Sequence, residues 1–337
     1  MPKTPLRYPG GKSRAIDVIM PHIRSLDCGE LCSPFLGGGS IELKCAEEGM
    51  TVHGYDLFQP LVWFWEALLS NPKKLAEYVN DYRGNVRDYA DPKVLMRDIT
   101  KECKPQKCLA KGTHDVYCAE HANLLRILED DLLGFGPRKE FNKVKEAVNN
   151  RRGVKSQDKL FAAAAEYYLI NRTSFSGNVS SGGWSWKASW ARLTQSNLDR
   201  LREFTVTNFS VSAADFKDSI AAHPEAGLYL DPPYCLNVSD LPVLNEDGEP
   251  VNQEILYGNE GDHHEGLDHT GLAAILKARD KWVLSYNDCK YIRKLYKGYK
   301  IIDVDWAYGM KNVKARPINP KTGKPEMGES SEILIIG

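Results

Sequence analysis

The hydrophobic pattern near the N-terminus is that of a strand, a helix and a second strand. Glu30–Phe35 is a short apolar run, followed by a glycine turn and by an amphipathic stretch that Ser40 is expected to cap and Gly49 to end. Thr51–Tyr55 is the next apolar run, and it ends on Asp56. A strand–helix–strand unit of this kind predicts a parallel sheet with helices packed on it.

The same alternation resumes in the last part of the chain. Thr205–Val211, Gly227–Leu230 and Lys281–Tyr286 have the composition of further strands. Two late apolar runs, Ile301–Val304 and Glu332–Ile336, are expected to pair as an antiparallel edge. The predicted fold class is therefore α/β, with a Rossmann-like sheet.

Between these two parts the chain is polar, helical in pattern and broken, until Asp158, which is expected to cap a more regular helix. We interpret this stretch as an insertion. The predicted catalytic domain comprises residues 1–65 and 195–337, and the predicted insert, mainly helical, comprises residues 66–194.

Composition then narrows the class of protein. The chain has 337 residues, of which 42% are hydrophobic and 26% charged, as in ordinary soluble globular proteins, so disorder and coiled coil are excluded. No apolar run approaches the roughly 18 residues of a membrane span. The first residues have no apolar stretch of the kind expected in a secretory signal, and the eight cysteines form no dense framework, so a cytoplasmic protein with reduced thiols is expected.

Charge is distributed locally rather than globally. The 44 Lys and Arg residues against 45 Asp and Glu residues give a net charge of -1, so any nucleic-acid surface must be a local one. The densest positive run is 138–155, with seven basic residues against two acidic ones, although such a run is as often a solvated face. The segment 240–265 holds eight acidic residues and no Lys or Arg, and we expect it to lie away from a phosphate backbone.

Two glycine-containing motifs suggest ligand binding. Gly11-Lys12-Ser13 imitates the end of a phosphate-binding P-loop, but Leu6 stands where the first glycine is required, so an ATPase is not indicated. The turn at 37–39 follows a strand and opens a helix, as a dinucleotide-binding loop does, although Glu42 replaces its third glycine. A purely structural turn stays open as the alternative.

Two acidic residues end predicted strands and are therefore expected at the carboxyl edge of the sheet. Asp56 is placed to accept hydrogen bonds from ribose hydroxyls. Asp231 opens the sequence Asp-Pro-Pro-Tyr at 231–234, in which the prolines hold an extended backbone without N–H groups. The Asp231 carboxylate and the Pro232 carbonyl are two acceptors beside an aromatic ring, and they suit a planar base with an exocyclic NH2 group.

Four motifs in order give a family resemblance. They are Arg-Tyr-Pro-Gly-Gly-Lys at 7–12, Pro-Phe-Leu-Gly-Gly-Gly-Ser at 34–40, Asn-Arg-Thr-Ser-Phe-Ser-Gly at 171–177, and 231–234. The chain resembles the Dam-like DNA adenine-N6 methyltransferases, in their alpha motif order, over nearly its whole length. The resemblance implies a class I S-adenosylmethionine-dependent methyltransferase sheet with an inserted target-recognition domain. The implied activity is site-specific methylation of the N6 amine of a flipped-out adenine.

The resemblance also implies roles for individual residues. The catalytic motif is Asp231, Pro232, Pro233 and Tyr234. The residues expected to bind S-adenosylmethionine are Tyr8, Gly10, Gly11, Lys12, Pro34, Phe35, Gly37, Gly39, Asp56, Asp215, Phe216 and Asp231. The residues expected to contact double-stranded DNA are Asn171, Arg172 and Phe175, to which the charge pattern adds Arg151, Arg152 and Lys155.

Some residues depart from the family pattern. Ser33 stands where the family usually carries Glu, so the methionine end of the cofactor is expected to be held differently. Ser176 replaces a usual Asn, so the recognition sequence cannot be carried over. The alternatives left open are an amino-methyltransferase acting on cytosine N4, on RNA or on a protein amide, and an inactive DNA-binding relative.

A cysteine- and histidine-containing stretch in the insert raises the question of zinc. Its candidate ligands are Cys103, Cys108, His114, Cys118 and His121. Their spacings lack the tight C-x2-C pairs of common structural zinc sites, so no metal is predicted there. We also expect a monomer that needs no protein partner.

Overall fold

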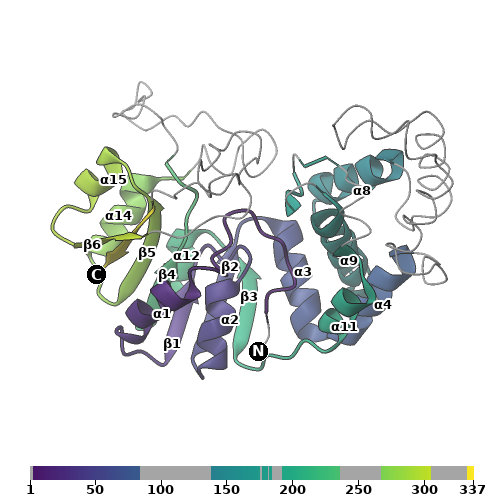
Figure 1. Ribbon diagram of the computed structural model, residues 1–337, viewed down its shortest axis with the longest axis horizontal. Helices are drawn as coiled ribbons and strands as arrows, with labels where there is room; N and C mark the ends of the chain where they lie inside the picture. Colours follow the sequence, from purple (N-terminus) through teal and green to yellow (C-terminus); the bar gives the residue numbers. More distant parts are fainter. Residues whose placement is uncertain are drawn as a thin grey trace, which may run out of the picture. The chain divides into compact units, whose positions relative to one another are not determined.

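The computed structural model describes residues 3–83, 138–174, 177–180, 182–183, 192–235, 267–304 and 332–337. The chain divides into two compact units (Figure 1). The first joins residues 1–70 to residues 204–337, and the second comprises residues 71–203. The sequence-based boundaries stand at 65/66 and 194/195, whereas the two units meet at 70/71 and 203/204.

A seven-stranded sheet is the centre of the first unit, with the order β3-β2-β1-β4-β5-β7-β6. Its strands are β1 (Glu30–Ser33), β2 (Thr51–Asp56), β3 (Phe209–Ala213), β4 (Gly227–Leu230), β5 (Trp282–Asn287), β6 (Lys300–Val304) and β7 (Glu332–Ile336). The first five are parallel, while β7 runs antiparallel to both of its neighbours. The α/β prediction and the parallel β1–α2–β2 unit are confirmed.

Helices cover both faces of this sheet (Figure 1). One face packs against α1 (Ile16–Arg24), α2 (Ser40–Glu47) and α3 (Gln59–Ser70). The other packs against α12 (Phe216–Ala222), α14 (His269–Lys277) and α15 (Lys290–Leu295). Because both faces are covered, β4 is buried at every position and β5 at every position but its last, as is typical of parallel sheets.

The strand order places one ligand-binding position at the carboxyl edge. The chain runs from β1 outward to β2 and β3 and then returns to β4 on the other side of β1. The strand order therefore reverses between β1 and β4, and open α/β sheets bind their ligands at the carboxyl ends of the strands at such a switch point. The glycine turn follows β1, and Asp231 directly follows β4.

Two predicted boundaries in this unit differ from the structure. Gly39, at φ 66°, precedes the first residue of α2, so Ser40 begins the helix rather than capping it. The strand β3 starts at Phe209 rather than Thr205, because the Asn208 side chain bonds the carbonyls of Ala46 and Met50 and fixes the chain just before the strand.

The two late strands do pair antiparallel, as predicted, but they do not form an isolated edge. Ile301 pairs with Ile335, and Leu284 of β5 pairs with the same Ile335 from the other side. β7 is thus an inner strand, which fits its almost complete burial.

The second unit is helical in its described part. It comprises α4 (Pro72–Arg83), α8 (Arg138–Asn150), α9 (Gln157–Thr173) and α11 (Gln195–Arg202). The apolar helix α9 packs against α4 and α8. Ser156, and not Asp158, caps α9 by accepting a hydrogen bond from the Lys159 amide, whereas Asp158 pairs with Lys74 at 2.9 Å.

No helix in the described ranges is both long and apolar enough to span a bilayer.

Candidate active site

Asp231 lies at the carboxyl end of β4, where the Pro232 and Pro233 residues hold the backbone extended. Its side chain is 21% exposed. Burial raises the pKa of this carboxyl group, while the ammonium of Lys12 and the hydroxyl of Tyr234 act in the opposite direction. The site therefore holds a carboxylate that depends on its neighbours for its charge.

The strongest of these neighbours is Lys12. Its ammonium nitrogen Nζ lies 2.7 Å from Oδ1 and 2.8 Å from Oδ2 of Asp231, and its side chain is only 4% exposed. The Gly10 carbonyl also accepts from Nζ, at 3.1 Å, and a carboxylate oxygen of Glu332 lies 3.9 Å away. A segment near the N-terminus, the end of β4 and the start of β7 therefore meet in one buried cluster of charges.

An aromatic stack fixes the ring of Tyr234. Its hydroxyl donates to Asp231 Oδ1 at 3.3 Å, and the Lys12 ammonium lies 5.1 Å from its ring centroid. The ring stacks on buried Tyr286, with centroids 6.0 Å apart. His269, the first residue of α14, hydrogen-bonds the Tyr286 hydroxyl. Tyr286 and His269 thus act as positioning residues for Tyr234.

The glycine turn after β1 is packed against aromatic side chains. Gly37 and Gly39 have φ angles of 50° and 66°, which side chains rarely allow. A Cβ at Gly37 or Gly38 would lie 2.8 Å from the side chain of Tyr8. Trp65 donates from Nε1 to the Gly37 carbonyl at 3.2 Å. The glycines therefore permit close approach of the Tyr8 segment to the turn.

Asp56 at the end of β2 braces the same turn. Its Oδ2 accepts from the Gly37 amide at 3.0 Å, and its Oδ1 accepts from the Phe58 amide at 2.9 Å. Each carboxylate oxygen has two lone pairs. Asp56 can thus organise the turn and still offer acceptors to a hydroxyl group.

Ser33 and Glu42 form a second buried carboxyl site at the end of β1. The Ser33 hydroxyl donates to Glu42 Oε1 at 2.7 Å, and Glu42 is 2% exposed. Burial raises the pKa of Glu42 to about 7, and the charge of Asp231 adds to this rise. Ser33 differs from the usual Glu of the family pattern, and Glu42 replaces the third glycine of a dinucleotide-binding loop. These two unusual residues are hydrogen-bonded to each other.

Other residues expected at the cofactor lie at the same edge. Phe35 and Phe216 stack with centroids 5.9 Å apart, and Phe216 is buried. Asp215 caps α12 by accepting from the Lys217 amide at 2.9 Å. The Gly11 amide donates to the Tyr8 carbonyl and closes the turn before Lys12, while Pro34 is buried next to Ser33.

The residues expected to contact DNA have different environments in the second unit. Asn171 is fully buried, and its amide donates to the Gly177 carbonyl at 2.9 Å, so it supports the following turn. Arg172 donates from Nε to the Arg192 carbonyl at 3.1 Å and lies over the ring of Tyr168.

The basic run is part helix and part loop. Arg151 pairs with Glu166 at 2.7 Å, while Arg152 and Lys155 are exposed. Phe175, the stretch at 103–121 and the acidic segment 240–265 lie outside the described residues.

Sequence reasoning missed two residues of the charge cluster and its surroundings. Glu332 has a sequence signal, because it is a charged residue that opens an otherwise apolar strand. Glu42 has a weaker one, since it takes a glycine position in the loop motif. The pairing of Lys12 with Asp231 has no local signal, because the residues are 219 positions apart.

Comparison with known proteins agrees with this site. The family model of the D12 class N6 adenine-specific DNA methyltransferases matches residues 8–310. The chain therefore belongs to this family, and it is an enzyme that methylates the N6 amine of adenine in DNA. The family transfers the methyl group from S-adenosylmethionine. A search among curated proteins found no match.

Proposed function

We propose that Asp231 and the Pro232 carbonyl bind the two N6 hydrogens of an adenine that has been flipped out of the DNA duplex. The observation that carries this assignment is the buried pair of Asp231 and Lys12 at the carboxyl edge of the sheet. Adenine inside a duplex cannot reach such a position, so the base must leave the stack. Tyr234 is the platform on which the base stacks.

Asp231 acts in this mechanism as an anionic acceptor and not as a strong base. The N6 lone pair is delocalised into the ring, and two accepted hydrogen bonds localise it on nitrogen. As N6 bonds to the methyl carbon, the bond from that carbon to the sulfonium sulfur breaks and its electron pair goes to sulfur. Positive charge develops on N6, and the carboxylate stabilises it electrostatically. One N6 proton then leaves to solvent. Lys12 maintains the ionised form of Asp231 against the effect of burial.

The residues at the edge have the chemistry to hold S-adenosylmethionine, which supplies a methyl group on a sulfonium centre. Asp56 offers acceptors for the ribose hydroxyls, and the Phe35–Phe216 pair offers an apolar surface for the adenine ring. The backbone of the turn at Gly37 allows a ligand to approach closely.

The Ser33–Glu42 pair is proposed to hold the ammonium of the methionine end. Within the described ranges, Glu42 makes no salt bridge, and its side chain bonds the neutral hydroxyl of Ser33. A buried carboxyl group without a cation is costly to ionise. A ligand ammonium is the partner that lowers this cost, so Glu42 supplies the carboxylate that position 33 lacks.

The second unit is proposed to bind DNA through its exposed basic residues. Arg152 and Lys155 follow helix α8 and are exposed, as phosphate contacts require. Arg172 belongs to the motif at 171–177, and the Arg192 carbonyl holds its guanidinium. Its substitution should therefore reduce binding of the cognate site more than binding of random DNA. Arg151 is assigned to the ion pair with Glu166 instead.

The experiment is transfer of a labelled methyl group to mixed-sequence duplex DNA and, in a parallel reaction, to RNA, followed by digestion to nucleosides and mass spectrometry. Wild-type protein should yield N6-methyladenine, and Asp231→Ala should lose at least about a hundredfold of rate while it retains cofactor binding. Labelled N4-methylcytosine, or label on RNA alone, would refute the acceptor assignment. Near wild-type transfer by Asp231→Ala would refute the mechanism.

A further inference from the structure

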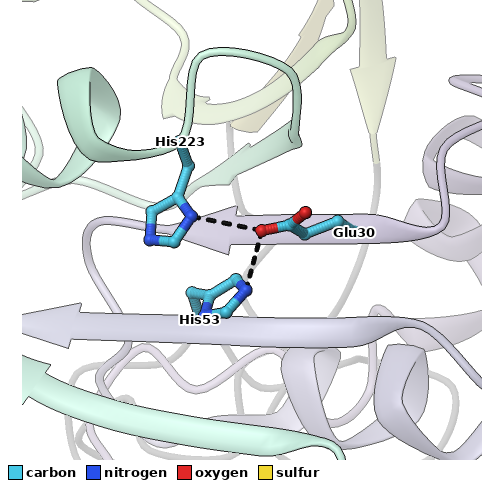
Figure 2. A group of neighbouring side chains, drawn as sticks. All are labelled: Glu30, His53 and His223. Carbon is cyan, nitrogen blue, oxygen red and sulfur yellow. Dashed lines mark hydrogen bonds and ion pairs between the residues drawn. The ribbon is translucent and has the colours of Figure 1, made fainter.

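Two histidines and a glutamate meet on the sheet away from the catalytic edge (Figure 2). Glu30 opens β1, His53 lies in β2, and His223 follows the last residue of α12. Asp56 lies three residues beyond His53 on β2, which at the rise of a strand is about 10 Å. The cluster is therefore separate from the charge cluster of Asp231.

One carboxylate oxygen faces both imidazole rings. Glu30 Oε1 lies 2.8 Å from Nε2 of His53 and 3.2 Å from Nδ1 of His223. The three ligand atoms all lie within 4.8 Å of one another. In a tetrahedral zinc site with bonds near 2.1 Å, ligand atoms are about 3.4 Å apart, so small side-chain movements would admit an ion.

The environment of His53 suits binding of a metal through Nε2. The Ser210 hydroxyl donates to the Val52 carbonyl at 3.3 Å and lies 3.1 Å from Nδ1 of His53. With Nδ1–H donating to the Ser210 oxygen, the neutral ring directs the lone pair of Nε2 at Glu30 Oε1, 2.8 Å away. An ion between these two atoms satisfies both acceptors.

The two imidazole rings pack against each other beside the carboxylate. They are stacked with centroids 4.1 Å apart, and each directs one ring nitrogen at Glu30. Neutral imidazole is the form that binds metals.

Hydroxyl groups orient both rings from behind. His53 Nδ1 contacts Ser210, and His223 Nε2 lies 2.8 Å from the Tyr55 hydroxyl. Metal-binding histidines almost always have such a partner on the second nitrogen, which fixes the ring and the tautomer. The cluster has this feature at both of its histidines.

We propose that Glu30, His53 and His223 bind a divalent transition metal ion of the zinc class, with a fourth coordination position open to water. The ion would join β1, β2 and the segment between α12 and β4. Because the ligands lie away from the catalytic edge, the ion stabilises the sheet and takes no part in methyl transfer. This proposal does not depend on the proposed roles of Asp231 or Glu42.

The test uses the full chain, stripped with a chelator and titrated with Co2+, with absorption of the bound ion and competition by Zn2+ as readouts. The wild-type protein should bind one more equivalent than His53→Gln/His223→Gln. The variant His22→Gln, which removes an imidazole from α1, is the matched control and should bind as wild type does. Zn2+ should raise the thermal unfolding midpoint of wild type and leave kcat unchanged.

Two further measurements distinguish loss of the metal ligands from misfolding of the double variant. Tyr55→Phe leaves all three ligands in place and should weaken binding by about 10- to 100-fold. X-ray absorption of the bound ion should show nitrogen and oxygen ligands only. Equal stoichiometry in wild type and the double variant, or sulfur ligands from cysteines elsewhere in the chain, would overturn the proposal.

Discussion

The ammonium of Lys12 contacts both carboxylate oxygens of Asp231, at 2.7 and 2.8 Å, although 219 positions separate the two residues. The contact is nearly closed to solvent on the lysine side. Since burial alone would favour a protonated Asp231, this ion pair determines the pH range in which the acceptor is charged.

Replacing Lys12 should therefore change the pH dependence of the enzyme. In Lys12→Met the pKa of Asp231 rises further above its ordinary value, so the acidic limb of kcat/KM against pH moves to higher pH. The unfolding midpoint should also fall, because a buried carboxylate loses its partner. Lys277→Met, at an exposed position of α14, is the control. An unchanged pH profile for Lys12→Met would contradict this role of the ion pair.

Asp56→Ala should weaken S-adenosylmethionine binding by about 1–3 kcal/mol, the scale of a lost charged acceptor. Part of this loss comes from the turn itself, since Asp56 also holds the Gly37 amide. Asp56→Asn retains an acceptor oxygen and should lose less. Calorimetry measures the cofactor affinity, and DNA affinity serves as the internal control. Equal cofactor affinity in all three proteins would remove Asp56 from the site.

Glu42 should make the protein less stable at neutral pH than in mild acid. The pKa of Glu42 is about 7 in the folded protein, against an ordinary value of 4.5, so the folded protein binds the additional proton between these values. Stability consequently falls as pH rises from about 4.5 to about 7, by about 3 kcal/mol in total.

The variant Glu42→Gln retains an acceptor for Ser33 and should lose this pH dependence. Urea unfolding at pH 5 and pH 8 measures the difference from wild type, and Glu225→Gln at an exposed position is the control. A wild type and a Glu42→Gln protein with parallel pH dependence would show that Glu42 titrates normally.

Arg152→Gln/Lys155→Gln should weaken binding to all DNA sequences alike. The slope of log K against log salt should become less steep by up to about two, one unit for each lost phosphate contact. Arg151→Gln should lower stability instead, because it breaks the pair with Glu166. The control is Lys277→Gln/Lys290→Gln in the first unit. If the slope of Arg152→Gln/Lys155→Gln equals that of wild type, the basic run is a solvated face.

The parts of the site that the sequence predicts are those encoded locally. The strand–turn–helix at 30–49 and the Asp-Pro-Pro-Tyr motif carry their own signals of periodicity, glycine and proline. The Lys12–Asp231 contact depends on how two distant segments pack, and the Ser33–Glu42 bond depends on how β1 and α2 pack. Hydrophobic periodicity carries no information on either packing arrangement. The boundary at Asn208 likewise depends on carbonyls of a different part of the chain.

The position of β7 between β5 and β6 couples local unfolding to the catalytic cluster. The edge strand β6 is joined to the sheet through β7. When β7 detaches from β5, β6 detaches with it, so the amide protons of β6 exchange with solvent at least as often as β7 is released. Glu332 begins β7 and lies beside Lys12. An excursion that releases the β6–β7 ribbon therefore also takes one carboxylate away from the charge cluster, and ligands that stabilise the cluster should slow exchange in a strand that they never touch.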